Sequence, residues 1–237
     1  MKILAFDSTA KAASAAVCEN EKLLALYNVD NGLTQSELLL PMVENLLASL
    51  KLDYSDISIF ATSVGPGSFT GVRIGVALLK GIAFGRDAAC IGVSTLEALA
   101  ENAKGLDGII GPVMDARRNE FYNAIFKCEG KDLQRLTPDR AISADELSHE
   151  LSQYNEKIYL VGDGYDVARK LLSERGVKLS ETPVLLRNEN AYSIASVALK
   201  KYNNGEITTD TEIMPTYLRL PQAERERLER LKENEGK

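Results

Sequence analysis

Histidine is nearly absent from this chain, since His149 is the only one in 237 residues. A His-Glu-x-x-His motif, or any metal site with two imidazole ligands, needs a second histidine. A Ser-His-Asp triad would have to use His149, whose polar neighbours predict a position on the surface of a helix. Pro66 also stands where a Gly-x-Ser-x-Gly element around Ser68 would have its first glycine. The sequence therefore disfavours zinc peptidase and serine hydrolase chemistry.

Cysteine pairs and long apolar runs are missing as well. The three cysteines are far apart, form no Cys-x-x-Cys motif and predict buried thiols in a reducing compartment. Lys80 interrupts the longest apolar stretch, Val72–Phe84, and only a short apolar run precedes Asp7, so we expect neither a membrane span nor a signal peptide. The net charge of −6 argues against a protein that holds nucleic acid by itself through many phosphates. We expect a cytoplasmic protein with no metal and no other cofactor.

The order of expected elements is the same in the two halves of the chain. An apolar strand that ends in an acid, a polar turn and further strands occur first from Lys2–Asp7 and again from Gly108–Asp115. Capping boxes at Thr34–Glu37 and Ser143–Glu146 predict that helices begin there. The repeat predicts an α/β fold with two lobes of mixed sheets flanked by helices: 1–105, 106–220, and a charged tail over 221–237. The later elements that we expect are a strand at Pro183–Leu186 and helices at about Tyr165–Arg175 and Ala191–Tyr202.

Two of the expected helices, Thr34–Leu50 and Thr70–Phe84, carry more apolar residues than one contact with a sheet requires. Gly71 and Gly75 lie four residues apart on one face of the second helix. A glycine inside a helix costs about 1 kcal/mol relative to alanine, so we expect these two to let a neighbouring helix come close. That neighbour is either the other helix of this chain or another subunit. The residues that we expect at a partner surface are Leu39, Met42, Val43, Leu46, Leu47, Gly71, Gly75, Leu78, Leu79 and Ile82.

The segment Gly65–Phe69 is a candidate phosphate-binding loop. It lacks the Gly-Lys-Ser/Thr run of a Walker A loop, and Thr70 stands where a dinucleotide fingerprint would have its third glycine. Backbone N–H groups at the start of the following helix could still attract an anion. The alternative, which we favour, is that Gly65 and Gly67 only allow a tight turn.

The same region carries a family resemblance. Residues 63–75 read Ser-Val-Gly-Pro-Gly-Ser-Phe-Thr-Gly-Val-Arg-Ile-Gly, a long and specific motif that resembles the TsaB family, also called YeaZ. Gln35 departs from the family pattern, which has histidine at this position. The resemblance covers nearly the whole chain, because it continues at Ile3–Thr9, Thr34–Pro41, Met114–Tyr122 and Tyr217–Arg219.

The resemblance implies the actin-like ATPase (ASKHA) fold, with two ribonuclease-H-like lobes. It implies a non-catalytic scaffold or activator subunit of the complex that forms N6-threonylcarbamoyladenosine in tRNAs reading codons that begin with A. A TsaD-type catalytic subunit would pair with the two helices, and a TsaE-type ATPase would dock on the pair. The chain would meet tRNA only through the complex, and in isolation it could form homodimers through the same surface. Remnants of a nucleotide site would be Asp7, Ser8, Thr9 and Asp115.

Two enzymatic alternatives and one binding alternative stay open. The first is a phosphotransferase or ATPase of the same fold, in which Asp7 and Asp115 would organise magnesium. The second is a metallopeptidase, which only the historical name of the glycoprotease-like family suggests. The third is direct tRNA binding through Arg117 and Arg118, two arginines in a turn that would have to outweigh the negative net charge.

Overall fold

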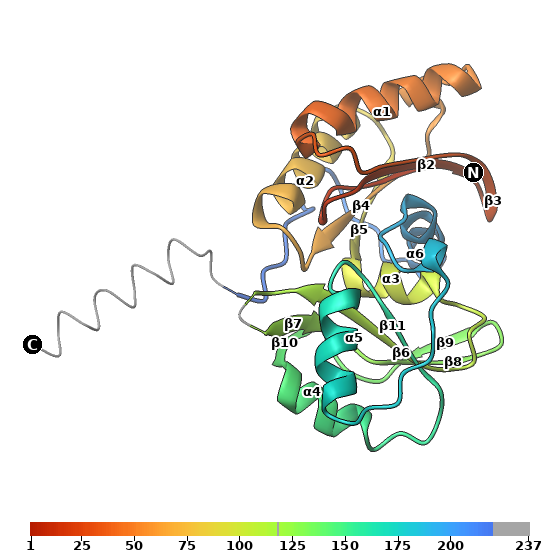
Figure 1. Cartoon of the computed structure of the whole chain (residues 1–237). Helices are drawn as coiled ribbons and strands as arrows, with labels where there is room; N and C mark the ends of the chain where they lie inside the picture. The colour runs from red at the N-terminus through yellow and green to blue at the C-terminus, as the bar shows by residue number, and fades with distance from the viewer. Residues whose placement is uncertain (118, 220–237) are drawn as a thin grey trace, which may run out of the picture.

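The chain folds into two α/β lobes, which lie one above the other in Figure 1. The computed structural model describes residues 1–117 and 119–219. The expected charged tail, 221–237, therefore lies outside the described residues. None of the helices in the described part of the chain is long and apolar enough to cross a membrane.

The N-terminal lobe is built on a five-stranded sheet with the order β3-β2-β1-β4-β5. β1 (Lys2–Asp7) lies in the middle, antiparallel to β2 (Ala13–Glu19) and parallel to β4 (Ile59–Gly65). β3 (Lys22–Val29) completes an antiparallel meander on one side, and β5 (Ala89–Ser94) adds a parallel strand on the other. The first strand, ending in an acid, and the hairpin after it are confirmed.

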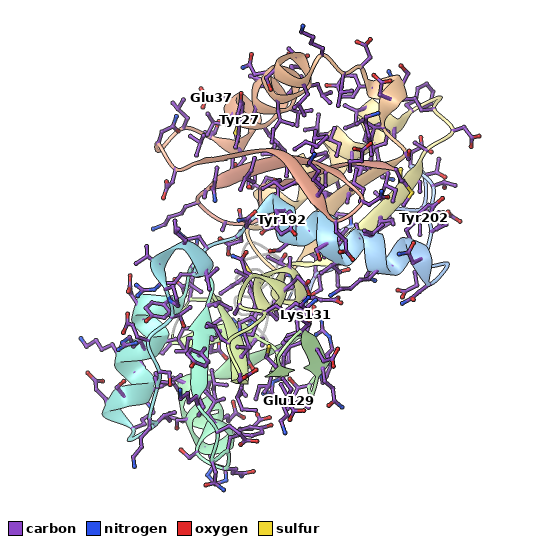
Figure 2. All side chains as sticks on the ribbon, turned by 90° about the vertical axis from the view of Figure 1, so that its right-hand side faces the viewer. Tyr27, Glu37, Glu129, Lys131, Tyr192 and Tyr202 are labelled. Carbon is purple, nitrogen blue, oxygen red and sulfur yellow. The ribbon has the colours of Figure 1, made fainter. Side chains whose placement is uncertain are left out.

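Helices cover both faces of this sheet. α1 (Gln35–Leu50) and α2 (Phe69–Ala83) pack on one face, and α6 (Ala191–Asn203) packs on the opposite face (Figure 1). Figure 2 shows α6, with Tyr192 and Tyr202, along the lower side of the N-terminal lobe. The predicted capping box of α1 is present, and a short 3₁₀ turn, Tyr54–Asp56, leads from α1 to β4.

The C-terminal lobe has a six-stranded sheet in which β6 (Gly108–Asp115) is central. β6 pairs antiparallel with β7 and β8 and parallel with β11, and β10 and β9 lie at the two edges. The other strands are β7 (Glu120–Asn123), β8 (Phe126–Glu129), β9 (Asp132–Arg135), β10 (Arg140–Ser143) and β11 (Ile158–Val161). α4 (Ala144–Leu151), which begins with the predicted capping box, and α5 (Tyr165–Glu174) bury their apolar faces in one core with β6 and β11.

α3 (Thr95–Asn102) lies between the two lobes. Leu96 and Leu99 pack with Ile110 and Met114 of β6, and α3 also contacts α6. A single core cluster therefore links the connecting helix to the C-terminal sheet, so the two lobes share buried surface.

Two sequence-based boundaries need correction. The expected strand at Pro183–Leu186 is instead a 3₁₀ turn, Val184–Leu186, in which Val184 and Leu185 are exposed. Three apolar residues in a row resembled a buried strand, but the chain pairs with β11 only earlier, at Ser180. The spatial lobes also differ from 1–105 and 106–220, because α6 returns to the N-terminal sheet.

Candidate functional site

The two helices predicted to bind a partner turn most of their apolar residues into the protein's own core. They meet Leu4, Phe6 and Phe60 of the N-terminal sheet. Most of the side chains expected at a partner surface are therefore packed within this chain, and binding of a partner by the two helices stays a prediction. The buried residues are Leu39, Met42, Val43, Leu46, Leu47, Gly71, Gly75, Leu79 and Ile82, and Leu78 is half-buried.

Gly71 and Gly75 make room for a loop of this chain. A Cβ atom on Gly71 would lie 1.9 Å from the backbone oxygen of Ser8, and one on Gly75 would lie 2.8 Å from Ser8 Oγ and 2.9 Å from Thr62 Oγ1. The Ser8 hydroxyl donates a hydrogen bond to the Gly71 carbonyl oxygen at 2.8 Å. The neighbour that requires these glycines is therefore the segment after β1, and neither α1 nor a second subunit is needed to explain them.

A different face of the two helices is open to solvent. On α2, Ala77 and Gly81 are exposed and lie four residues apart, and a Cβ atom on Gly81 would meet nothing within 4 Å. Phe84, at the end of α2, is 77% exposed, and Met214 beside Lys80 is 64% exposed. The small and apolar residues of this face form a surface that a neighbouring helix could approach closely.

A second candidate site is a cavity of about 440 Å³ between the lobes. Its walls are the β1–β2 loop at residues 9–11, the start of α2 at 66–70, the β6–β7 turn at 115–117 and the C-terminal segment at 216–219. That last segment joins the lobes, because its Thr216 N–H donates to Val64 at 2.7 Å and its Arg219 guanidinium donates to the Ala116 carbonyl oxygen at 3.2 Å.

The predicted nucleotide remnants in the first lobe are occupied by bonds within the chain. Asp7 is 1% exposed, and one of its carboxylate oxygens accepts hydrogen bonds from the Thr9 backbone N–H at 2.7 Å and the Thr9 hydroxyl at 2.8 Å. The other oxygen accepts from the Ser63 hydroxyl. Burial raises the pKa of Asp7, and these three bonds oppose that shift. The carboxylate therefore holds the loop in place, and of the predicted residues of this lobe only Thr9 lines the cavity.

The second-lobe turn presents its acid to the cavity. Asp115 is exposed there, and its Oδ1 accepts the Arg117 backbone N–H at 2.7 Å. Arg117 and Asn119 adopt left-handed conformations, with φ of 66° and 59°, so this turn has the backbone shape that glycines usually supply. Asp163 Oδ1 accepts the Asp115 N–H at 3.3 Å, which places a second carboxylate beside the first. The structure therefore brings Thr9 and Asp115 to one cavity, and leaves Asp7 and Ser8 beneath it.

A third carboxyl group, Glu189, is buried where the lobes meet. It is 4% exposed, and its Oε1 has no hydrogen-bond partner among the described residues. Its backbone oxygen accepts from Asn28 of β3, and the neighbouring Arg187 carbonyl oxygen accepts from Gly162 of the other lobe. Burial, and then the charges of Asp163 and Asp7, raise the pKa of Glu189 well above its ordinary value, while the backbone N–H groups of Glu189 and Asp163 oppose the shift.

Glu189→Gln is expected to make the protein more stable at neutral pH. A raised folded-state pKa means that stability is complete below the pKa of the unfolded chain and is lost as pH rises toward the folded-state value. The amide cannot ionise, so the variant avoids this loss, a gain of about 1.4 kcal/mol for each pH unit by which the pKa is raised. Urea denaturation from pH 4 to pH 8 measures the difference, which should grow with pH. Exposed Glu174→Gln is the control, and equal pH slopes for Glu189→Gln and the wild type would contradict this account.

Comparison with known proteins identifies the family to which most of the chain is similar. Residues 34–227 match the family described as TsaD, tRNA N6-adenosine threonylcarbamoyltransferase. The chain is 31% identical over 222 residues to the tRNA threonylcarbamoyladenosine biosynthesis protein TsaB of Escherichia coli, covering 92% of this chain and 95% of that protein. The chain belongs to the TsaB family. TsaB of Bacillus subtilis is 28% identical over 225 residues, covering 94% and 96% of the two chains.

The solved structure of YeaZ from Pseudomonas aeruginosa shows the same fold. It superposes with a TM-score of 0.75 at 23% identity, covering 92% of this chain and 99% of that chain. The expected α/β fold, with two lobes of mixed sheets flanked by helices, is thereby confirmed. The family resemblance drawn from residues 63–75 is confirmed as well.

The structure places three residues of this TsaB-family chain at or near the cavity that the sequence analysis did not assign to a site. Gln35, the departure from the family pattern, donates from Nε2 to the carbonyl oxygens of Ala10 and Lys11, both at 2.9 Å, and so ties α1 to the cavity loop. Tyr217 lay in a recognised motif, Tyr217–Arg219, and that motif was the signal that could have placed it at the site. Glu189 has no local sequence signal, because its burial comes from the contact between the lobes.

Proposed function

We propose that this chain is a non-catalytic scaffold subunit in the biosynthesis of tRNA threonylcarbamoyladenosine in the cytoplasm. Membership of the TsaB family supports a role in this pathway, because the relatives from Bacillus subtilis and Escherichia coli are named as tRNA threonylcarbamoyladenosine biosynthesis proteins. In this proposal a TsaD-type subunit carries out the threonylcarbamoyl transfer, and a TsaE-type ATPase docks on the pair. The single observation that carries the scaffold role is the exposed face of α2 at Ala77 and Gly81, with the exposed Phe84 at its end.

The composition of that face supports a helical partner. Ala77 and Gly81 keep the backbone of α2 accessible, and the half-buried Ile74 and Leu78 lie beside them. Phe84 ends the face with a large exposed ring of the kind that anchors interfaces. A surface of this kind allows close helix–helix packing, which is the geometry expected for pairing with a related subunit. The same face would also serve a homodimer of the isolated chain.

The chemistry of the polar residues supports a role without catalysis. Both carboxylate oxygens of Asp7 already accept hydrogen bonds from the chain. Within residues 1–117 and 119–219, no three His, Cys, Asp or Glu side chains gather in a way that could hold a metal ion. The one histidine, His149, lies on α4, away from the cavity between the lobes. A phosphotransferase that used Asp7 and Asp115 would have Asp115 at the cavity, but its Asp7 is already held by hydrogen bonds within the chain.

Titration calorimetry against the TsaD-type subunit of the same organism tests the proposal. We expect saturable binding, and we expect transfer of the threonylcarbamoyl group to tRNA only when the TsaD-type subunit is present. Absence of binding at micromolar concentrations would overturn the scaffold role. Transfer or ATP turnover by the isolated chain would instead favour the phosphotransferase alternative.

A further inference from the structure

The cavity between the lobes has an aromatic wall. The rings of Phe69 and Tyr217 have their centroids 4.8 Å apart, and Tyr217 remains 41% exposed. The Arg73 guanidinium stacks over Phe69 at 3.8 Å, and its Nε donates to the Tyr217 hydroxyl at 2.8 Å. Because these contacts hold the Tyr217 ring in one place, it forms a rigid platform at the edge of the cavity.

A second aromatic ring lines the cavity from the other lobe. Tyr122 of β7 lies under the Arg219 guanidinium, whose carbon is 6.0 Å from the ring centroid. Arg219 is fixed in turn by its ion pair with Glu120 and its bond to the Ala116 carbonyl oxygen. Aromatic side chains of both lobes therefore line a space of about 440 Å³, within the range of pockets that take small ligands.

The polar lining is mixed in charge. Lys11, on the β1–β2 loop, is exposed at the cavity, and the Arg117 side chain also lines it. Asp115 and Asp163 add two carboxylates to the same lining. One phosphodiester carries a single negative charge, which one cation at the cavity, Lys11, is enough to balance. Carboxylates are suitable acceptors for ribose hydroxyl groups, as they are in dinucleotide sites.

We infer that this cavity receives one ribonucleotide of a single-stranded RNA. The base stacks on Tyr217, the phosphate meets Lys11, and the ribose hydroxyls donate to Asp115 or Asp163. Stacking on aromatic rings combined with a nearby cation is the common way in which proteins hold single-stranded nucleic acid. The inference goes beyond the scaffold role, in which tRNA is met only through the partner.

Fluorescence anisotropy with a fluorescein-labelled pentaribonucleotide and the full chain at low salt tests the inference. Tyr217→Leu should weaken binding about tenfold through lost stacking, while Tyr217→Phe, which keeps the ring and loses only the hydroxyl contact with Arg73, should weaken it much less. Lys11→Ala should weaken binding and reduce the dependence of log K on log salt by about 0.7, the value for one phosphate on a single strand. Lys131, on the β8–β9 turn away from the cavity, supplies the control Lys131→Ala (Figure 2).

Three outcomes would overturn the inference. They are no RNA binding by the wild type, equal binding by the wild type and Tyr217→Leu, and displacement of the oligonucleotide by AMP at the same concentration as by unlabelled RNA. The last outcome would assign the cavity to a free nucleotide. None of these measurements involves the TsaD-type subunit. Absence of RNA binding would therefore leave the scaffold proposal intact. Absence of binding to the TsaD-type subunit would in turn leave the RNA-binding inference intact.

Discussion

Gly71→Ala is expected to destabilise the protein by about 3 kcal/mol or more, as an overpacked core site does. The added Cβ atom would lie 1.9 Å from the Ser8 backbone oxygen, and a backbone atom cannot move aside as a flexible side chain can. The loop after β1 would have to shift, which would also break the hydrogen bond from the Ser8 hydroxyl to Gly71. Chemical denaturation followed by circular dichroism measures the free energy of unfolding.

Gly81→Ala is the matched control for this prediction. Both glycines lie within α2, but Gly81 is exposed and has open space where a Cβ atom would stand. Alanine there should therefore raise stability by about 1 kcal/mol through helix propensity alone. Equal effects of the two substitutions would show that Gly71 is not packed on the Ser8 loop, and would contradict the description of this region.

Ala77→Arg is expected to weaken binding to the TsaD-type partner on the order of 100-fold, the effect of losing an interface hot spot. Ala77 is exposed on α2, so the arginine can extend into solvent and the isolated chain should keep its stability. In a helix pair, the same side chain would separate the two backbones and bring a charge into apolar contact. Calorimetric titration gives the affinity, and thermal unfolding of the isolated variant verifies that it is folded.

Val167→Arg is the control that separates the position of the added arginine from its charge. Val167 is exposed on α5 of the C-terminal lobe, so the substitution adds the same charge to a helix outside the proposed interface. It should leave partner binding unchanged. If both arginine variants bound as tightly as the wild type, the exposed face of α2 would not be the docking surface. If both lost binding equally, charge alone would explain the effect.

Local sequence signals predicted much of the fold. The strand ending in Asp7, the hairpin after it and the capping boxes at Thr34 and Ser143 depend on interactions within a few residues, and the structure contains all of them. The strand expected at Pro183–Leu186 failed because three apolar residues have no periodicity that distinguishes a strand from an exposed turn. The position of α6 on the N-terminal sheet also has no local signal, since it depends on which lobe offers an uncovered face.

The residues of the predicted partner surface likewise could not be chosen from local sequence signals. The sequence of α2 shows two sets of small residues, Gly71 with Gly75 and Ala77 with Gly81, and periodicity alone does not tell which set faces inward. Only the path of the loop at Ser8 decides it, and that path depends on the pairing of β1 with β4. The grouping of Asp115, Asp163 and Tyr217 around one cavity likewise follows from the contact between the lobes, which separate motifs could not reveal.

The most direct test of the proposed function is the nucleoside content of tRNA after depletion of this protein in its own organism. Mass spectrometry of digested tRNA should show loss of threonylcarbamoyladenosine, with recovery on re-expression of the wild type or Val167→Arg. Re-expression of Ala77→Arg should not restore the nucleoside. An unchanged amount of threonylcarbamoyladenosine in the depleted cells would contradict the account.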